Sequence, residues 1–371
     1  MATMVEIRFR SNFGSNLSVW LFKFISLTTL TLISSYDCCQ NDRVVVGVLA
    51  QFLHHSNRQY IAASYVKQME SSGARVVPVF VGRNEEYYRN LMSKINGILL
   101  PGGGSPLTHG PYADAMDKII TIALEMNQNG TYFPVWATCL SFEKLILNFM
   151  QTKNDQWKSM CHVQNISLNL EIEKSVLDDP SQTKMFHEMN ETIPSILTIL
   201  QTKNVTPNYH RVCIEVDTFN SNTNLIKNFR LISWNRFKNY TFVSTIEHIK
   251  FPIFGSAWHP EKSQFEFVVS ANVGNINHDR WAILASQYFS NFFINECRKN
   301  CGHFVDKLEE SQHLIYNYVE YLEYIGNDPK SSIEERYHFP ESCNKAHLSP
   351  FSFEMFKFLS FFVIIYNLFS L

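Results

Sequence analysis

The sequence predicts an α/β fold with a mostly parallel central sheet flanked by helices. Short valine-rich apolar runs, typical of buried parallel strands, alternate with segments of helical spacing. This β-α-β-α order favours one parallel sheet with helices packed on its faces. Of the 371 residues, 45% are hydrophobic and 18% are charged, and the net charge is −2. These values exclude a disordered chain and a nucleic-acid binder that works by charge alone.

The expected elements follow one another along the first part of the chain. Strands are expected at residues 44–51, 74–81, 98–101 and 133–139, because each is a short apolar run. Helices are expected at residues 60–71, 113–127 and 140–149, where apolar residues recur with helical spacing. Gly73 follows the first of these helices, and glycine is common at the C-terminal end of a helix.

The second part of the chain is less regular. Residues 151–212 are more polar, and strand-like segments return at 231–234, 240–244 and 253–258. Residues 281–299 form a long amphipathic helix pattern, whereas no clear period is found after about Asp328.

Both ends of the chain carry apolar runs. Residues 20–33 follow Arg8 and Arg10 and precede two serines, so we expect a signal peptide over residues 1–35, with a hydrophobic first helix as the alternative. The uncharged run 358–371 is short for a spanning helix but suits the tail of a lipid-anchor signal, so membrane anchorage through it stays open. We expect a secreted glycoprotein, found in the extracellular space or in the lysosome or vacuole. The candidate glycosylation sites downstream of the signal are Asn129, Asn165, Asn190, Asn204 and Asn239.

The eight cysteines include no Cys-x-x-Cys pair, which argues against a zinc ribbon or a thioredoxin-type site. Cys139 stands out because it lies at the carboxyl end of an expected strand, with a helix starting directly at Leu140. Such a turn lifts a nucleophile out of the sheet, and the helix N-terminus favours the thiolate. The free Leu140 amide could bind an oxyanion. The alternative is a buried structural cysteine.

Two further motifs also follow expected strands. The loop Gly102–Gly104 could bring a second amide, that of Gly103, to the thiol, although an ordinary turn is the alternative. His259 with Glu261 two residues later could supply a base and the group that orients it, although a lone histidine is more often structural. Carboxyl ends of parallel strands meet at one edge of a sheet, so we expect the three motifs to form one site.

These motifs together resemble the gamma-glutamyl hydrolases, which are secreted and lysosomal folate polyglutamate hydrolases. The segments 134–143 and 258–262 carry the resemblance, and further matches follow in the same order from about Arg43 to about Tyr324. The resemblance implies a three-layer fold like that of class I glutamine amidotransferases, and no metal or cofactor. It divides the chain into a hydrolase domain over residues 42–325 and a C-terminal extension over residues 326–371.

The resemblance also implies roles for individual residues. Cys139 matches the nucleophile, His259 the base, Glu261 the third catalytic residue and His210 a histidine that binds substrate; Gly103 and Leu140 would supply the oxyanion amides. The implied partner is a small-molecule substrate, a folate poly-γ-glutamate, and a homodimer stays open. Because this substrate is polyanionic, the candidate cationic partners are Arg58, Lys67, Arg211 and Lys262.

The sequence departs from the family at two positions beside the nucleophile, where Ala137 and Ser141 replace glycines. Extra atoms at such a turn can misplace a nucleophile, which can cost about 100-fold in rate. This steric argument predicts that restoring both glycines raises turnover or leaves it unchanged. The same argument leaves an alternative open, in which the chain is a catalytically impaired relative that acts as a binding protein. A glutamine amidotransferase or glutaminase, which would be intracellular, is a less favoured alternative.

Overall fold

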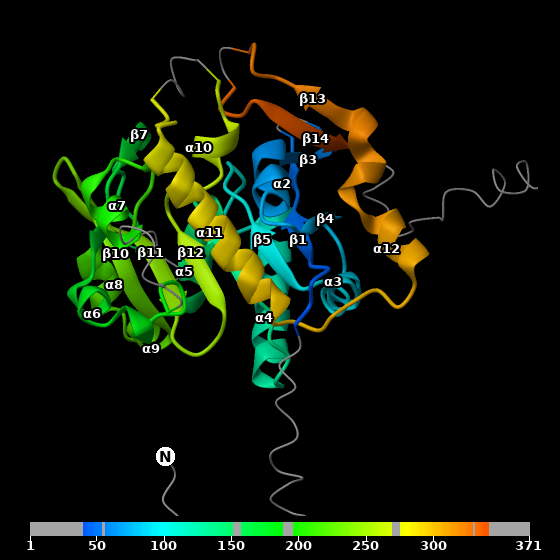
Figure 1. Ribbon diagram of the computed structural model, residues 1–371, viewed down its shortest axis with the longest axis horizontal. Coiled ribbons are helices and arrows are strands. Elements are labelled where there is room, and N and C mark those ends of the chain that lie inside the picture. The colour runs from blue at the N-terminus through cyan, green and yellow to red at the C-terminus, as the bar shows by residue number, and fades with distance from the viewer. Residues whose placement is uncertain are drawn as a thin grey trace, which may run out of the picture. The chain divides into compact units, whose positions relative to one another are not determined.

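The computed structural model describes residues 40–53, 56–150, 157–187, 196–268, 275–328 and 331–340 (Figure 1). The expected signal peptide, Asn190 and the apolar run 358–371 lie outside these residues. Among the helices in these ranges, none is long and apolar enough to cross a membrane.

The described residues form strands and helices that alternate over much of the chain. The strands are β1 (Val45–Leu49), β2 (Gln51–Phe52), β3 (Gln59–Ala62), β4 (Arg75–Val79), β5 (Gly97–Leu100), β6 (Val135–Thr138), β7 (Val163–Leu168), β8 (Glu171–Ile172), β9 (Thr206–His210), β10 (Phe229–Phe237), β11 (Tyr240–His248), β12 (Ile253–Ser256), β13 (Leu322–Tyr324) and β14 (Glu335–Phe339). The helices are α2 (Ala63–Glu70), α3 (Glu85–Met92), α4 (Gly110–Gln128), α5 (Leu140–Met150), α6 (Lys174–Asp178), α7 (Ile196–Thr202), α8 (Val216–Ser221), α9 (Thr223–Asn228), α10 (Lys262–Phe265), α11 (Arg280–Arg298) and α12 (Lys307–His313), with 3₁₀ turns η2 (Pro180–Gln182) and η3 (Ile315–Tyr321).

The main sheet has eight strands in the order β4-β1-β5-β6-β12-β11-β10-β8. The strands from β4 to β12 pair in parallel, and β11, β10 and β8 extend the sheet with antiparallel pairing. The predicted α/β fold with a mostly parallel sheet is therefore confirmed. A four-stranded antiparallel sheet, β13-β14-β3-β2, and the pair β7-β9 complete the structure.

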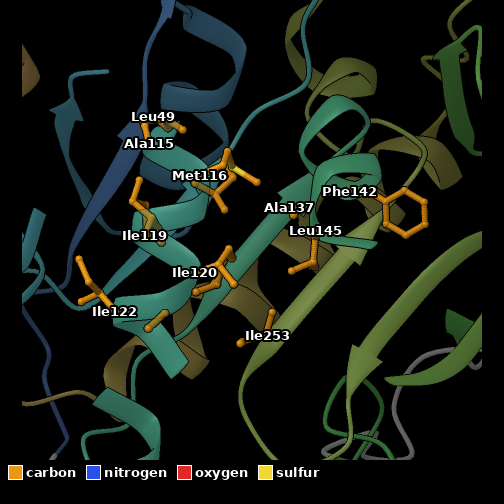
Figure 2. Packing of buried hydrophobic residues seen from close by; sticks show 14 of the residues in the cluster. Leu49, Ala115, Met116, Ile119, Ile120, Ile122, Ala137, Phe142, Leu145 and Ile253 are labelled. Carbon is orange, nitrogen blue, oxygen red and sulfur yellow. The ribbon is translucent and has the colours of Figure 1, made fainter. Parts of the chain in front are cut away.

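Two apolar clusters cover the two faces of the main sheet. One contains residues of α3, α4 and α5, and the other contains residues of α2, α7 and α11. Successive residues of β1 alternate between the clusters, as Val45 and Val46 do, because neighbouring side chains of a strand point to opposite faces. Figure 2 shows the first cluster, in which α4 packs beside β6 and Ala137 lies among the core side chains. The result is the three-layer arrangement that the sequence predicts.

The structure differs from the expected elements at several places, of which three bear on the packing of the domain. Residues 60–62 belong to strand β3 rather than to the first helix, because they pair with β2 and β14. Helix α3 was not expected, since its eight residues are largely polar and bury only one side. Residues 335–339, within the C-terminal extension, form β14 and pair with β3, so this part of the extension packs onto the domain.

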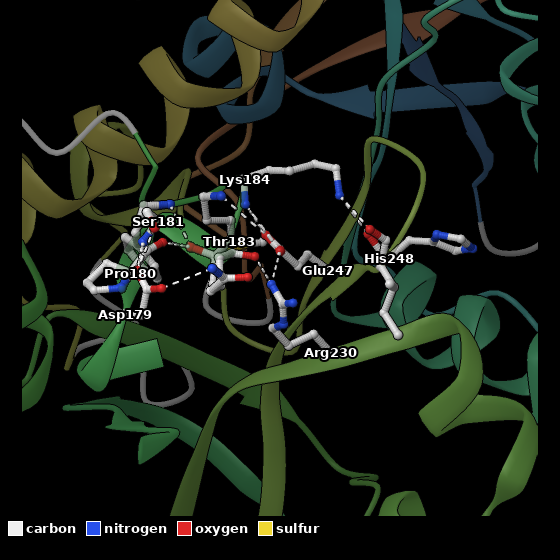
Figure 3. A network of polar contacts seen from close by, with 12 residues as sticks. Asp179, Pro180, Ser181, Thr183, Lys184, Arg230, Glu247 and His248 are labelled. Atoms are coloured by element: carbon white, nitrogen blue, oxygen red, sulfur yellow. Dashed lines mark hydrogen bonds and ion pairs between the residues drawn. The ribbon is translucent and has the colours of Figure 1, made fainter. Parts of the chain in front are cut away.

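A buried carboxylate, Glu247, ties the segment after η2 to strand β11 (Figure 3). It accepts the backbone N–H groups of Lys184 and Met185 and lies 3.3 Å from the Arg230 guanidinium. The Lys184 ammonium donates to the carbonyl of His248, the residue after Glu247. These bonds supply hydrogen-bond partners to a carboxylate that would otherwise be costly to bury. Glu247 does not line the pocket described below.

Candidate active site

Three neighbouring parallel strands end at one pocket. Strand β5 leads into Pro101–Gly104, β6 into Cys139, and β12 into His259. All three segments line a pocket of about 940 Å³ at the carboxyl ends of these strands. The expectation that the three motifs form one site is confirmed in its geometry, as the topology of parallel sheets requires.

Cys139 occupies a sharp turn between β6 and α5. Its backbone φ is 50°, a left-handed conformation that residues other than glycine seldom adopt. The neighbouring bonds hold it there, because Cys139 N–H donates to the Ser256 carbonyl over 2.8 Å and its own carbonyl accepts from Glu143 N–H over 2.9 Å. Strain retained at a strand-to-helix turn is typical of nucleophile elbows.

The surroundings of Cys139 favour the neutral thiol. Burial raises the pKa of the Cys139 thiol, and the carboxylates of Glu143 and Glu261 raise it further. The Leu140 N–H bonds the sulfur and acts in the opposite direction, as the helix N-terminus was expected to do, but it is the weaker influence. The sequence shows the helix N-terminus but not the burial or the two carboxylates that act against it. The thiol needs a base to become a nucleophile.

His259 has the geometry of that base. Its Nδ1 lies 2.6 Å from Glu261 Oε1, and Glu261 is completely buried. Burial disfavours the charged carboxylate, but the His259 imidazole, helped by the Lys262 ammonium and a backbone N–H, offsets this and lowers the pKa of Glu261. A carboxylate that accepts the Nδ1 proton leaves Nε2 as the basic nitrogen. Nε2 is buried and has no hydrogen-bond partner among the described residues, so it is free to take a proton.

Gly102 brings the base and the nucleophile together. A Cβ at this position would lie 2.8 Å from His259 Cε1, 2.8 Å from Tyr65 Oη and 3.1 Å from Cys139 Cβ, so no side chain fits. The following Gly103 packs as tightly on Gln51, whose amide donates to the Gly102 carbonyl over 2.7 Å. Both predicted oxyanion donors, Gly103 and Leu140, line the pocket. Within the described residues, neither of their N–H groups donates to a backbone carbonyl.

Tyr65 belongs to the site, although the sequence analysis does not single it out. Its hydroxyl accepts the Gly102 N–H over 2.8 Å and lies 3.3 Å from His259 Nδ1. Burial and the Glu261 carboxylate raise the pKa of the Tyr65 hydroxyl, which therefore stays protonated. Tyr65 thus connects the glycine loop to the His259–Glu261 pair. A tyrosine on an apolar helix face gives no sequence signal for this, because core packing explains it equally well.

His210 lies on another wall of the pocket, at the end of β9. Its Nδ1 lies 2.8 Å from the Val212 carbonyl and its Nε2 lies 3.1 Å from Asn208 Oδ1. Burial lowers the pKa of His210 to about 4. A disulfide between Cys161 and Cys213 lies beside the ring. Because burial keeps the ring neutral and Nδ1 bonds the Val212 carbonyl, His210 is suited to shape the wall rather than to transfer protons.

The other predicted residues fall into two groups. Of the four candidate cations, Arg211 and Lys262 line the pocket, whereas Arg58 and Lys67 do not, and Lys67 pairs with Glu335. Of the four described sequons, three asparagines are exposed: Asn129, Asn204 and Asn239. Asn165 instead lines the pocket, where its Oδ1 accepts from Tyr209 Oη and from Asn275 N–H.

The two replaced glycines occupy different surroundings. Ala137 is completely buried in β6 and adds a methyl group to the core. Ser141 is also completely buried, and its hydroxyl donates to the Pro101 carbonyl over 2.7 Å. Tyr112 Oη lies 2.6 Å from Ser141 Oγ and 3.0 Å from the same carbonyl. The serine thus forms specific bonds to the loop that carries Gly103.

The sequence profile of the Peptidase C26 family matches residues 44–261, a span that contains Cys139, His210, His259 and Glu261. This chain belongs to the Peptidase C26 family. Curated relatives extend the likeness over most of the chain. The gamma-glutamyl hydrolase of Rattus norvegicus is 36% identical over 89% of this chain and 99% of its own length. That of Homo sapiens is 35% identical over 80% and 90%, and gamma-glutamyl hydrolase B of Dictyostelium discoideum is 32% identical over 88% and 90%. The residues matched by the C26 profile thus include all pocket-lining residues from Gln51 to Glu261.

Proposed function

We propose that this chain is a gamma-glutamyl hydrolase that cleaves γ-glutamyl bonds by thiol acyl transfer. The observation that carries the proposal is the meeting of Cys139 and the His259–Glu261 pair around Gly102, in a chain whose relatives are named for this activity. Family membership supports the reaction class, and the geometry supports the part that we propose for each group.

The reaction begins when His259 Nε2 takes the proton of the Cys139 thiol. The sulfur attacks the γ-carbonyl carbon, and the oxyanion is stabilised by the amides of Gly103 and Leu140. The C–N bond breaks as His259 returns the proton to the leaving amine, which leaves a γ-glutamyl thioester on Cys139. Water, deprotonated by His259, then hydrolyses the thioester and restores the thiol. Glu261 keeps the proton of His259 on Nδ1 and stabilises the imidazolium.

Folate poly-γ-glutamates are the substrates that we propose for this site, on the strength of the resemblance. The roomy pocket, with Arg211 and Lys262 on its walls, supports a substrate that carries several carboxylates. We also propose that the mature protein is a secreted or lysosomal glycoprotein, as the apolar run at residues 20–33 suggests. N-terminal sequencing and glycosidase treatment of cell-derived protein test this; an intact Met1 with no change in mobility would contradict it.

The decisive experiment compares wild type with Cys139→Ala on folate pentaglutamate and a γ-glutamyl dipeptide. Wild type should release shorter products, and their lengths identify the cleaved bond. Cys139→Ala should lose turnover but keep the wild-type melting temperature. Retained turnover would exclude Cys139 as the nucleophile. Binding without turnover in the wild type would instead favour the impaired relative, and release of ammonia from glutamine would favour a glutaminase.

A further inference from the structure

Gln51 is a buried glutamine in the wall of the pocket. It begins strand β2, is 3% exposed, and lines the pocket together with Gly102 and Gly103. Its Nε2 donates to the Gly102 carbonyl over 2.7 Å, and its Oε1 accepts a longer bond, of 3.4 Å, from the Ser105 hydroxyl. Because the amide oxygen only accepts and the amide nitrogen only donates, these partners fix which end of the side chain faces Gly102.

Two consecutive peptide units of the glycine loop differ in how they are held. The unit between Pro101 and Gly102 is bonded at both ends, because its carbonyl and its N–H each bond a side-chain hydroxyl. The unit between Gly102 and Gly103 is held at its carbonyl by Gln51, whereas its N–H donates to no backbone carbonyl of the described residues. A trans peptide is planar, with its C=O and N–H pointing in opposite directions. By holding the carbonyl, Gln51 therefore also sets the direction of the Gly103 N–H.

The second of these peptide units needs a side chain to hold it. Both flanking residues are glycines, whose φ and ψ have few steric limits, so the unit can turn over at little cost. Once turned over, it would present a carbonyl oxygen where the Gly103 N–H now lies, and a carbonyl oxygen repels an oxyanion. Gln51 opposes this turn, because the turn would break its bond to the Gly102 carbonyl. Its side chain also packs so closely on Gly103 that a Cβ at that position would clash with it.

We propose that Gln51 is a positioning residue for the oxyanion site, which it completes by fixing the direction of the Gly103 N–H. This inference rests on the proposed function and adds to it a residue that acts through the backbone. A donor that is already oriented stabilises the oxyanion better than one that must first turn, because nothing reorganises as the charge develops. The oxyanion exists only after Cys139 has attacked, so the contribution of Gln51 should affect kcat rather than KM.

The first test compares Gln51→Met, which removes the amide at similar side-chain length, with the matched change Gln59→Met. Gln59 is completely buried in the neighbouring strand β3 and bonds the backbone of Val81, but it does not line the pocket. Both changes leave buried backbone groups without a partner and should lower the melting temperature. Gln51→Met should also lower kcat on a γ-glutamyl dipeptide about 10- to 100-fold with little change in KM, whereas Gln59→Met should change neither. An unchanged kcat in Gln51→Met, or equal losses in the two variants, would overturn the inference.

A γ-glutamyl aldehyde tests the oxyanion site without turnover. The Cys139 sulfur bonds the aldehyde carbon and the carbonyl oxygen takes the thiol proton, so this oxygen occupies the oxyanion site. Methylation of Cys139 by iodomethane also forms a bond to sulfur, with loss of iodide and a proton, but brings no oxygen to the site. Gln51→Met should weaken aldehyde binding about 10- to 100-fold and leave the methylation rate unchanged. A fall in both would indicate a displaced thiol and would refute the positioning role.

Protection of Cys139 from methylation reports aldehyde binding even in a protein that hydrolyses nothing, which separates this inference from the proposed function. If wild type fails to hydrolyse the dipeptide while aldehyde binding still depends on Gln51, hydrolysis is refuted and the positioning role stands. If wild type hydrolyses the dipeptide and Gln51→Met binds the aldehyde equally well, or if wild type binds no aldehyde, the positioning role is refuted. If methionine unfolds the protein, Gln51→Asn keeps an amide that is one methylene too short for the Gly102 carbonyl, and serves the same comparison.

Discussion

The Ser141 hydroxyl joins the helix after the nucleophile to the loop that carries Gly103. In Ser141→Ala, the Pro101 carbonyl loses one donor but keeps the Tyr112 hydroxyl at 3.0 Å, so no buried group is left without a partner. We therefore expect a loss of about 1 kcal/mol in the free energy of unfolding. Tyr112→Phe should cost a similar amount, because the Ser141 hydroxyl still satisfies the carbonyl. The double variant leaves the carbonyl with neither hydroxyl, and should lose about 1–3 kcal/mol more than the sum of the two.

Turnover should follow the same pattern. A loop released from Ser141 moves the Gly103 amide, and small displacements of catalytic groups can cost up to about 100-fold in rate. Glycine at position 141 should thus lower kcat, which reverses the prediction from the steric argument, because that argument did not include the hydroxyl. Urea unfolding and kcat/KM on a γ-glutamyl peptide measure both effects for the two single variants and the double. Additive losses in stability, or a rise in kcat for Ser141→Gly, would refute this reasoning.

Three further predictions follow from the site and its surroundings. His259→Asn should lower kcat far more than it raises KM, and Glu261→Gln should lower kcat less than His259→Asn does. Equal losses of kcat would contradict the separate roles of base and orienting group. Tyr65→Phe should lower kcat about 10-fold and lower the free energy of unfolding by about 1 kcal/mol, since it frees the Gly102 N–H; a change in KM alone would contradict a positioning role. His248 Nδ1 accepts two backbone N–H groups, and burial lowers the pKa of His248 to about 4. Its contribution to stability is complete above about pH 6.5 and is lost, by up to about 3 kcal/mol, as the pH falls toward 4; unfolding curves for His248→Gln should depend less on pH in this window.

The sequence predicts the sheet and the three strand-end motifs because local patterns determine both. Apolar runs define the strands, and the topology of a parallel sheet brings their carboxyl ends together. What it misses depends on contacts between distant segments. The segment 60–62 continues an apolar helix pattern, and only its pairing with β2 and β14 makes it a strand. The thiol of Cys139 is kept neutral by burial and by carboxylates that no local pattern reveals. Tyr65 and Ser141 act through single hydroxyl bonds, which composition and periodicity do not encode.

The pairing of β14 with β3 makes the order of synthesis important for activity. Lys67 of α2, the helix that follows β3, and Glu335 of β14 form an ion pair across 268 residues of sequence. A nascent chain on the ribosome exposes Cys139 long before residues 332–339 emerge, so its pocket lacks the wall that Ser332 and Ile333 form until those residues are translated. Closing so long a loop costs conformational entropy. We therefore expect the β14–β3 pairing to form late in folding. The cell therefore receives a finished active site only from a chain that has been translated through Phe339, and premature termination upstream yields a protein with an incomplete pocket.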